Sequence, residues 1–341
     1  AALFSVPLWA SAQIVEPGFE REVVAAGFAL PTATAFAPDG RVFVAEKNGV
    51  VKVVKDGVVL ATPLITLTDV NTFGDRGLIG MAVDPDFATN GYLYLSYTYE
   101  NTPGLNIAGA KTARIVRVTV VGDVASEATK QVLVGTEGGD ATNPSCEDFA
   151  VTVDCIASDS NSHSAGALTF GPDGKLYASL GDGADFAAVD VRALRAQNLD
   201  ALAGKVLRIN TDGTAPADNP FYTGNPNDNR SKVYALGFRN QFRLHFHPTT
   251  GKLYGGDVGW STWEEVNDVQ AGGNYGWPCR EGFAAQPEYG CAASSATTDP
   301  VYAYPHDSNG AGSIVLGAFP DNDAYPTVYD NTLFIGDYAQ Q

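Results

Sequence analysis

Basic residues are scarce in this sequence. Its 341 residues include 21 Lys and Arg against 39 Asp and Glu, which gives a formal net charge of −18 at pH 7. Binding the phosphates of a nucleic acid requires clustered Lys and Arg, so the composition argues against a nucleic-acid partner. The acidic balance favours solubility and suits a secreted protein, but it does not specify a fold.

Cysteine is also rare. The four cysteines form two close pairs, Cys146 with Cys155 and Cys279 with Cys291. Neither pair has the Cys-x-x-Cys spacing of a zinc site, and histidines are lacking nearby. We therefore expect two local disulfides that pin long loops in an exported protein, with a zinc site as the alternative.

Long apolar runs are absent after the first residues. Residues 1–12 are apolar, end in Ala-Ser-Ala and precede polar chain, like the end of a signal peptide. We expect the sequence to start inside that signal; a buried N-terminal strand is the alternative. No other stretch is long and apolar enough to span a membrane. These features predict a secreted or periplasmic protein in which residues 13–341 form one domain.

Amphipathic helix patterns are scarce as well, and only residues 189–202 have helical spacing, which suits a short helix in a loop. Instead, one hairpin pattern recurs: a short apolar strand, a turn rich in Pro, Asp and Gly, and a strand of alternating polarity. The five copies span residues 36–46, 83–97, 170–183, 246–259 and 325–338. Third strands follow from Val50, Ala113 and Lys205. The repeat predicts an all-β fold, a β-propeller with four-stranded antiparallel blades. A β-sandwich is the alternative, but it does not explain a repeated hairpin.

The two ends of the repeat also carry information. Residues 20–26 have the pattern of a lone strand, and the last hairpin stops at Gln341, directly after its second strand. In closed propellers an N-terminal strand often completes the final blade, which removes an open sheet edge. We therefore expect a propeller whose last blades are incomplete in this sequence.

One segment, residues 236–278, gathers the polar groups of greatest interest. Arg239 and Asn240 open one predicted strand, Asp257 ends the next, and an Asn-Tyr-Gly-Trp-Pro sequence closes the segment. A cation, an amide and a carboxylate at strand ends suit an anionic, oxygen-rich ligand together with a hard metal ion. An ordinary β-meander with common turn residues is the alternative.

Four groups of motifs in this order resemble the soluble quinoprotein glucose dehydrogenases, also called glucose/sorbosone dehydrogenases. They lie at residues 74–92 (with Gly-Asp-Arg-Gly-Leu-Ile-Gly, Asp-Pro and Asn-Gly-Tyr), 163–174, 237–240 and 264–278. The resemblance covers roughly residues 18–337. It implies a six-bladed propeller that holds pyrroloquinoline quinone (PQQ) with Ca²⁺. It also implies oxidation of an aldose at its anomeric carbon to a lactone, with electrons passed to an external quinone or cytochrome.

The resemblance assigns the site residues. His163 matches the catalytic base, and a neutral His suits proton abstraction near pH 7. Arg239 matches the arginine placed by the quinone, where a fixed cation stabilises charge on the reduced carbonyl. Asn240 matches the neighbouring amide, and Asp75 falls where relatives carry a Gln or Glu that contacts the site. Arg76 is expected to be structural.

The same resemblance places the metal. Ca²⁺ takes several oxygen ligands, including backbone carbonyls, and the family supplies two consecutive carbonyls that here fall at Gly259 and Trp260. Trp replaces the more familiar Pro, which does not matter for a carbonyl ligand. Glu265 and the carbonyl of Tyr275 match a second, structural calcium site; a solvated Glu264–Glu265 pair is the alternative.

Three features depart from the family pattern. A cofactor-contacting lysine would fall near Ala339, where there is none, and the late arginines that clamp PQQ would lie beyond Gln341. Ser162 replaces the Asp that precedes the catalytic His, so an orienting carboxylate must come from elsewhere. These departures keep a non-catalytic propeller that binds a protein or glycan as an alternative function.

Calcium-dependent lactonases and esterases are a second alternative, because they gather several Asp, Asn and Glu side chains onto one central ion. The candidates for such a set are Asp182, Asn240, Asp257 and Asp337. Of the other histidines, His245 and His247 lie in a strand pattern and are expected to be structural, whereas His306 lies in a loop. In an enzyme, loops at residues 138–161 and 281–298 are expected to choose the sugar.

Overall fold

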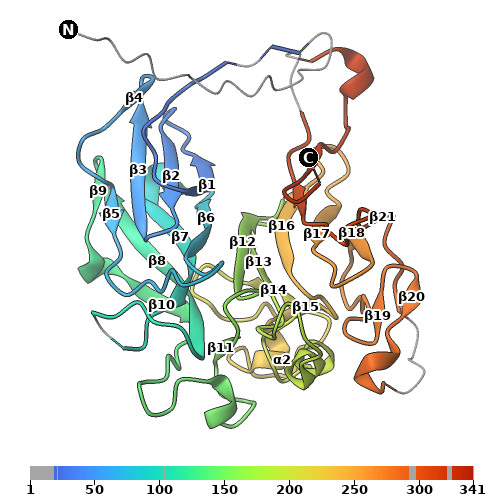
Figure 1. Cartoon of the computed structure of the whole chain (residues 1–341). Helices are drawn as coiled ribbons and strands as arrows, with labels where there is room; N and C mark the ends of the chain where they lie inside the picture. Colours follow the sequence, from blue (N-terminus) through green and yellow to red (C-terminus); the bar gives the residue numbers. More distant parts are fainter. Residues whose placement is uncertain (1–18, 21, 103, 292–296, 321–324, 341) are drawn as a thin grey trace, which may run out of the picture.

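The computed structural model describes residues 19–20, 22–102, 104–291, 297–320 and 325–340. Small antiparallel sheets dominate this part of the chain, and they stand side by side in Figure 1. The α-helices described there are α1 (Phe87–Asn90) and α2 (Asn229–Lys232), each a single turn. The predicted signal-peptide remnant, residues 1–12, lies outside the described residues.

The first two sheets come from the N-terminal half. The first has the order β1-β2-β3-β4, with β5 also paired to β3. The second has the order β10-β8-β7-β6, with β9 and β11 also paired to β8. Their strands are β1 (Pro31–Phe36), β2 (Val42–Glu46), β3 (Val50–Lys55), β4 (Val58–Val59), β5 (Ile65–Thr66), β6 (Leu78–Val83), β7 (Tyr92–Tyr99), β8 (Lys111–Val121), β9 (Val124–Ala125), β10 (Gln131–Val134) and β11 (Ile156–Ser158).

The next two sheets each have four strands, in the orders β12-β13-β14-β15 and β16-β17-β18-β21. Two further pairs, β19–β20 and β22–β23, complete the described sheets. The strands are β12 (Ala165–Phe170), β13 (Leu176–Leu180), β14 (Lys205–Ile209), β15 (Val233–Leu236), β16 (Gln241–Phe246), β17 (Leu253–Asp257), β18 (Trp263–Val269), β19 (Arg280–Glu281), β20 (Ala284–Ala285), β21 (Tyr302–Pro305), β22 (Ile314–Leu316) and β23 (Ile335–Asp337).

The first strand of each sheet faces a common centre. Strand β6 contacts β1 and β12, β12 contacts β16, and β16 contacts β22. A cavity of about 690 Å³ lies between these strands, and apolar side chains fill the space between neighbouring sheets. This radial arrangement is a β-propeller, as predicted, and the described residues form four blades and the additional pair β22–β23.

Four of the five predicted hairpins are confirmed, as β1–β2, β6–β7, β12–β13 and β16–β17. Turn glycines such as Gly40 and Gly174 take positive φ angles of 87° and 70°, which a residue with a side chain adopts only under strain. The predicted third strands are β3, β8 and β14. The turn residues therefore predicted the positions of these blades correctly.

The fifth hairpin was wrong in its first strand. A 3₁₀ helix, Thr327–Tyr329, follows Pro326, and the N–H of Tyr329 donates to the Pro326 carbonyl to close a turn. The partner of β23 is instead β22, a short strand that the sequence pattern did not reveal.

One other local prediction also needs correction. The described residues of 20–26 lie outside any strand, because they join no ladder in the described part of the chain. The short helix predicted within residues 189–202 is confirmed as a 3₁₀ helix, η3 (Val191–Gln197), with Asp190 accepting from the N–H of Arg192 at its start.

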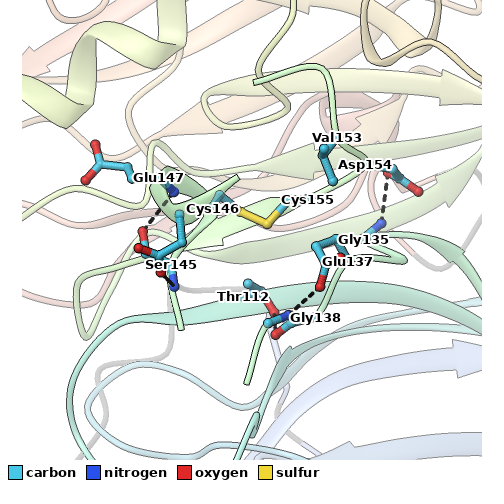
Figure 2. Close-up of a disulfide and its surroundings, with 12 residues drawn as sticks. Thr112, Gly135, Glu137, Gly138, Ser145, Cys146, Glu147, Val153, Asp154 and Cys155 are labelled. Carbon is cyan, nitrogen blue, oxygen red and sulfur yellow. Dashed lines mark hydrogen bonds between the residues drawn. A yellow bond between two sulfur atoms is a disulfide. The ribbon is translucent and has the colours of Figure 1, made fainter. Parts of the chain in front are cut away.

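Both predicted disulfides are present, Cys146–Cys155 and Cys279–Cys291. Figure 2 shows the first, which closes a loop between β10 and β11. Beside it, the Asp154 carboxylate accepts a hydrogen bond from the N–H of Gly135 at 3.1 Å. The cross-link and this bond hold a long loop against the end of the second blade.

Candidate functional site

His163 lies immediately before β12, at the mouth of the third blade. Its backbone has a φ of 54°, an uncommon conformation for a residue with a side chain. A Cβ on Gly181 would meet the His163 carbonyl oxygen at 2.2 Å, so only glycine fits there. His163 is 6% exposed. The close approach of the two backbones therefore holds the imidazole in a buried, fixed place.

The carboxylate of Asp182 orients this imidazole. His163 Nδ1 lies 3.1 Å from Asp182 Oδ1, which also accepts from the N–H of Ala184 at 2.9 Å. Its other oxygen accepts from Trp277 Nε1 at 2.7 Å. Because a carboxylate only accepts, Nδ1 carries the proton and Nε2 carries the lone pair. Burial, together with the nearby charge of Arg239, lowers the pKa of His163, although Asp182 opposes this shift. The ring is therefore a neutral base at pH 7.

Sequence reasoning had left the source of an orienting carboxylate open, because Ser162 stands where relatives have Asp. Asp182 fills that role from the loop after β13. It had been considered only as a possible calcium ligand. Its place in a Gly-Asp-Gly sequence directly after a buried strand was the available signal.

Arg239 and Asn240 lie where β16 begins, beside Asp182. The backbone N–H of Asp182 donates to the Arg239 carbonyl at 2.8 Å. The Asp257 carboxylate, at the end of β17, accepts from the backbone N–H of Arg239 at 3.0 Å and from that of Asn240 at 2.6 Å. These contacts bring together the predicted base, arginine and amide from two neighbouring blades.

The guanidinium of Arg239 is buried and points at backbone carbonyls. Nη1 donates to Val258 O at 3.1 Å and to Gly259 O at 2.5 Å, and Nη2 donates to Phe186 O at 2.9 Å. Its Cζ lies 5.6 Å from the ring centroid of Trp277. Nε is buried and has no hydrogen-bond partner among the described residues. Arg239 thus offers an unused donor inside the site.

Asp75 lies at the exposed rim of the site. Its N–H donates to the carbonyl of Asn161 at 2.8 Å, two residues before His163. Its charge acts to raise the pKa of His163. The buried Arg76 beside it donates to the carbonyls of Ser158 and Ser160 and is structural, as expected.

The Gly259–Trp260 step is held by Glu281, a residue that sequence reasoning did not select. Glu281 Oε1 accepts hydrogen bonds from the four successive N–H groups of residues 260–263, at 2.8 to 3.1 Å. A Cβ on Gly259 would lie 1.7 Å from the carbonyl oxygen of Trp263, so glycine is required at that point. A buried carboxylate therefore fixes the loop that carries the two predicted calcium-ligand carbonyls.

Glu265 and Tyr275, the predicted residues of a second calcium site, line the same small cavity. It has a volume of about 10 Å³ and is also bordered by Asp257, Gly259 and Glu281. Burial raises the pKa of Glu265 to about 7, although Glu265 accepts hydrogen bonds from the N–H of Gly282 and from Asn267. Burial and the nearby Glu265 charge also raise the pKa of Asp257. Glu264 and Glu265 are both buried, so they are not a solvated pair.

No group of three or more His, Cys, Asp or Glu side chains suited to a metal occurs in the described ranges. A metal here would rely on backbone carbonyls. The acidic side chains considered for a lactonase have separate partners: Asp182 bonds His163, and Asp337 accepts from Tyr304 at 2.6 Å. Nε2 of His306 lies 2.8 Å from Oε1 of the buried Glu264, and this carboxylate raises the pKa of His306. His306 is therefore paired with Glu264.

Comparison with known proteins identifies the family of this chain. The family model described as glucose / sorbosone dehydrogenase matches residues 28–341, so the chain belongs to this family. Quinoprotein glucose dehydrogenase B of Acinetobacter calcoaceticus is 29% identical over 318 residues, which cover 88% of this chain and 61% of the relative. The chain therefore spans less than two thirds of the length of that relative.

A solved structure supports the fold. The PQQ-bound form of aldose sugar dehydrogenase from Streptomyces coelicolor has a TM-score of 0.61 and 26% identity, covering 83% of this chain and 70% of that chain. Hedgehog-interacting protein of Homo sapiens is 28% identical over 245 residues, covering 66% of this chain and 32% of the relative. Proteins named for sugar oxidation and for protein binding thus both resemble the chain.

Proposed function

We propose that this member of the glucose/sorbosone dehydrogenase family is a PQQ- and Ca²⁺-dependent aldose dehydrogenase. It oxidises the anomeric carbon of a sugar to the lactone and passes the electrons to an external quinone or cytochrome. The observation that carries the proposal is the His163–Asp182–Trp277 hydrogen-bonded series beside the buried Arg239.

His163 has the state that the reaction requires. With its Nδ1 proton donated to Asp182, its Nε2 can accept the proton of the anomeric hydroxyl. The lactone carbonyl forms as the anomeric carbon loses a hydride, so the sugar gives up two electrons and two hydrogens. Asp182 stabilises the imidazolium that forms, because a carboxylate hydrogen bond is stronger to a cation.

The site residues fit a bound quinone. PQQ, when bound, is the two-electron oxidant that accepts the hydride. Its oxygens are acceptors, and the buried Nε of Arg239 is a donor without a partner among the described residues. Arg239 and Asn240 would hold and polarise it, with Asp75 at the rim of the site. The lysine that relatives place by the cofactor has no counterpart near Ala339.

The carbonyls of Gly259 and Trp260 are the proposed ligands of the catalytic Ca²⁺. The Gly259 oxygen accepts a hydrogen bond from Nη1 of Arg239, a donor that Ca²⁺ would replace at this carbonyl. Glu265 and the carbonyl of Tyr275 are the proposed ligands of a second Ca²⁺, since both border the small cavity, which is lined by the carboxylates of Asp257 and Glu281 and also by Arg239 and Arg280.

We also propose export to the periplasm or the cell exterior. The two disulfides support this, because such bonds persist in oxidising compartments. Within the described part of the chain, no helix is long and apolar enough to cross a membrane.

The test is a PQQ titration of the metal-free protein with and without Ca²⁺, followed by reduction of a dye with a panel of aldoses. We expect saturable, Ca²⁺-dependent binding and sugar-dependent reduction that His163→Ala abolishes. His247→Ala is the matched control, because His247 accepts from backbone N–H groups of the turn after β16, at the end of this strand opposite to Arg239 and Asn240. Absence of PQQ binding would refute the proposed dehydrogenase activity.

One alternative has support of its own. A propeller that binds a protein or glycan is favoured by the missing lysine and by the similarity to Hedgehog-interacting protein. It predicts no PQQ binding and no effect of His163→Ala on partner binding, so the same titration separates the two functions.

A further inference from the structure

Three aromatic side chains form a cluster beside Asp182, which accepts a hydrogen bond from one of them, Trp277. Trp260, Trp277 and Tyr289 contact one another edge to face, with ring centroids 5.4 to 6.3 Å apart. The base of the cluster is buried, because Trp277 is 4% exposed and packs on small alanines of the η3 region. The rings of Trp260 and Tyr289 are only half-buried. The cluster therefore presents aromatic surface to solvent beside the reacting groups.

Tyr289 reaches this place on the loop that the Cys279–Cys291 disulfide closes. It ends a 3₁₀ helix, Pro287–Tyr289, and Gly290 follows in the left-handed conformation. The N–H of Gln286 also donates to the Cys279 carbonyl at 2.9 Å, which fixes the same loop internally. The loop is thus braced at both of its ends, and the position of Tyr289 is preorganised.

Tyr289 packs with Trp260 against the buried Trp277, whose Nε1 donates to Asp182 of the proposed site. Burial raises the pKa of Tyr289 to about 12, and the charges of both Asp182 and Arg239 act on its phenol. Trp260 supplies the neighbouring ring and also one of the proposed calcium-ligand carbonyls. A ligand that bonds to His163 would therefore lie against these rings.

We propose that Tyr289 and Trp260 form the surface against which the sugar ring packs, and that Tyr289 is a specificity-determining residue of this protein. A pyranose has apolar C–H faces and a rim of hydroxyls. Half-buried aromatic rings next to a few fixed polar groups match that chemistry. The inference rests on the proposed sugar oxidation and adds the residues that select its substrate.

The alternative is that the cluster only stabilises the loop. Phe283 provides the comparison, because it is an aromatic residue on the same disulfide loop that is 54% exposed and packs on Trp263 instead, at 6.1 Å. Loss of either ring removes apolar contacts from the loop, but only Tyr289 lies by the reacting groups.

The experiment compares Tyr289→Leu, Tyr289→Phe and Phe283→Leu with the wild-type protein. Steady-state kinetics with PQQ and Ca²⁺ over a panel of aldoses give kcat and KM. Calorimetric titration with 1,5-anhydro-D-glucitol, a sugar without the anomeric hydroxyl, gives binding without turnover. PQQ titration of each variant reports whether the cofactor site is intact.

We expect Tyr289→Leu to raise KM and the Kd of the anhydro sugar about five- to tenfold, the loss of one aromatic contact. Its kcat and PQQ affinity should stay within about twofold of wild type, because the contact is the same before and during reaction. Tyr289→Phe keeps the ring and should raise KM and Kd less than Tyr289→Leu does, whereas Phe283→Leu should retain wild-type values.

The outcomes separate this inference from the proposed function. If the wild type oxidises aldoses and Tyr289→Leu leaves KM and Kd unchanged, the inference is overturned and the oxidation stands. Tyr289-dependent binding of the anhydro sugar without any oxidation would support the sugar surface and refute the dehydrogenase. Neither binding nor oxidation by the wild type would overturn both.

Discussion

Replacement of Asp182 by Asn is the sharpest test of the proposed chemistry. Asp182 is 1% exposed, and its carboxylate accepts hydrogen bonds from His163, Ala184 and Trp277 at 2.7 to 3.1 Å. The substitution keeps the shape and removes the charge. An amide can also donate to Nδ1, which would move the imidazole proton to Nε2 and leave no base facing the sugar.

The expected magnitude follows from the bond between His163 and Asp182. A hydrogen bond to a charged group contributes about 1.5 to 3 kcal/mol, and this one gains strength as the imidazolium forms. At about 1.36 kcal/mol per tenfold, its loss lowers kcat by about 10- to 150-fold, and the wrong tautomer lowers it further.

The pH profile gives a second readout. Asp182 acts to raise the pKa of His163, so Asp182→Asn should move the acid limb of kcat/KM to lower pH. The matched control is Asp185→Asn, since Asp185 lies on the same loop and accepts only from the N–H groups of Ala187 and Ala188. A variant with wild-type kcat and an unmoved acid limb would refute Asp182 as the orienting residue.

Three further predictions test Arg239, Glu265 in the small cavity, and Glu281, which holds the loop of residues 260–263. In Arg239→Lys the two Nη groups that donate to the carbonyls of Val258 and Phe186 are lost, because lysine has a single ammonium group. PQQ affinity, measured by calorimetry, should therefore fall about 100-fold. Equal affinity would contradict the proposed contact. Burial raises the folded-state pKa of Glu265 from 4.5 to about 7, so its contribution to stability is present below pH 4.5 and lost as pH rises to 7. In urea unfolding without metal, the free energy of unfolding of Glu265→Gln should therefore fall less between pH 4.5 and 7 than that of the wild type. Ca²⁺ should no longer stabilise this variant. Identical dependence of the free energy of unfolding on pH in the two proteins would argue against the raised pKa. Glu281→Ala leaves the N–H groups of residues 260–263 without their acceptor, and it should lower the free energy of unfolding by about 2 to 4 kcal/mol. A loss of less than about 1 kcal/mol would mean that solvent replaces the carboxylate.

Local sequence predicted the blades because a propeller hairpin is a local structure. The Pro-Asp-Gly turns and alternating strands lie within about 15 residues of one another, and four of them formed as expected. The prediction failed at residues 325–338, where β23 pairs with a strand about 20 residues earlier in the chain. A short strand between glycines has no pattern of its own, so its pairing is decided by the neighbouring sheet.

The site residues also divide into those that local motifs indicate and those that only the folded structure reveals. Sequence motifs selected His163, Arg239, Asn240 and the Gly259–Trp260 step as candidates, and the fold brings the first three together at neighbouring blade ends. Motifs do not report which carboxylate points at which partner.

The sequence by itself thus determined the all-β class, the repeat, both disulfides and the family, because turns, alternation and short motifs are encoded locally. Only the tertiary structure decided that Asp182 orients His163 across 19 residues, that Glu281 holds the Trp260 loop from 21 residues away, and that Tyr289 packs on Trp260. These contacts join separate loops. Their free energy depends on burial and on exact distances that arise when the sheets pack around a common centre, and no local pattern contains them.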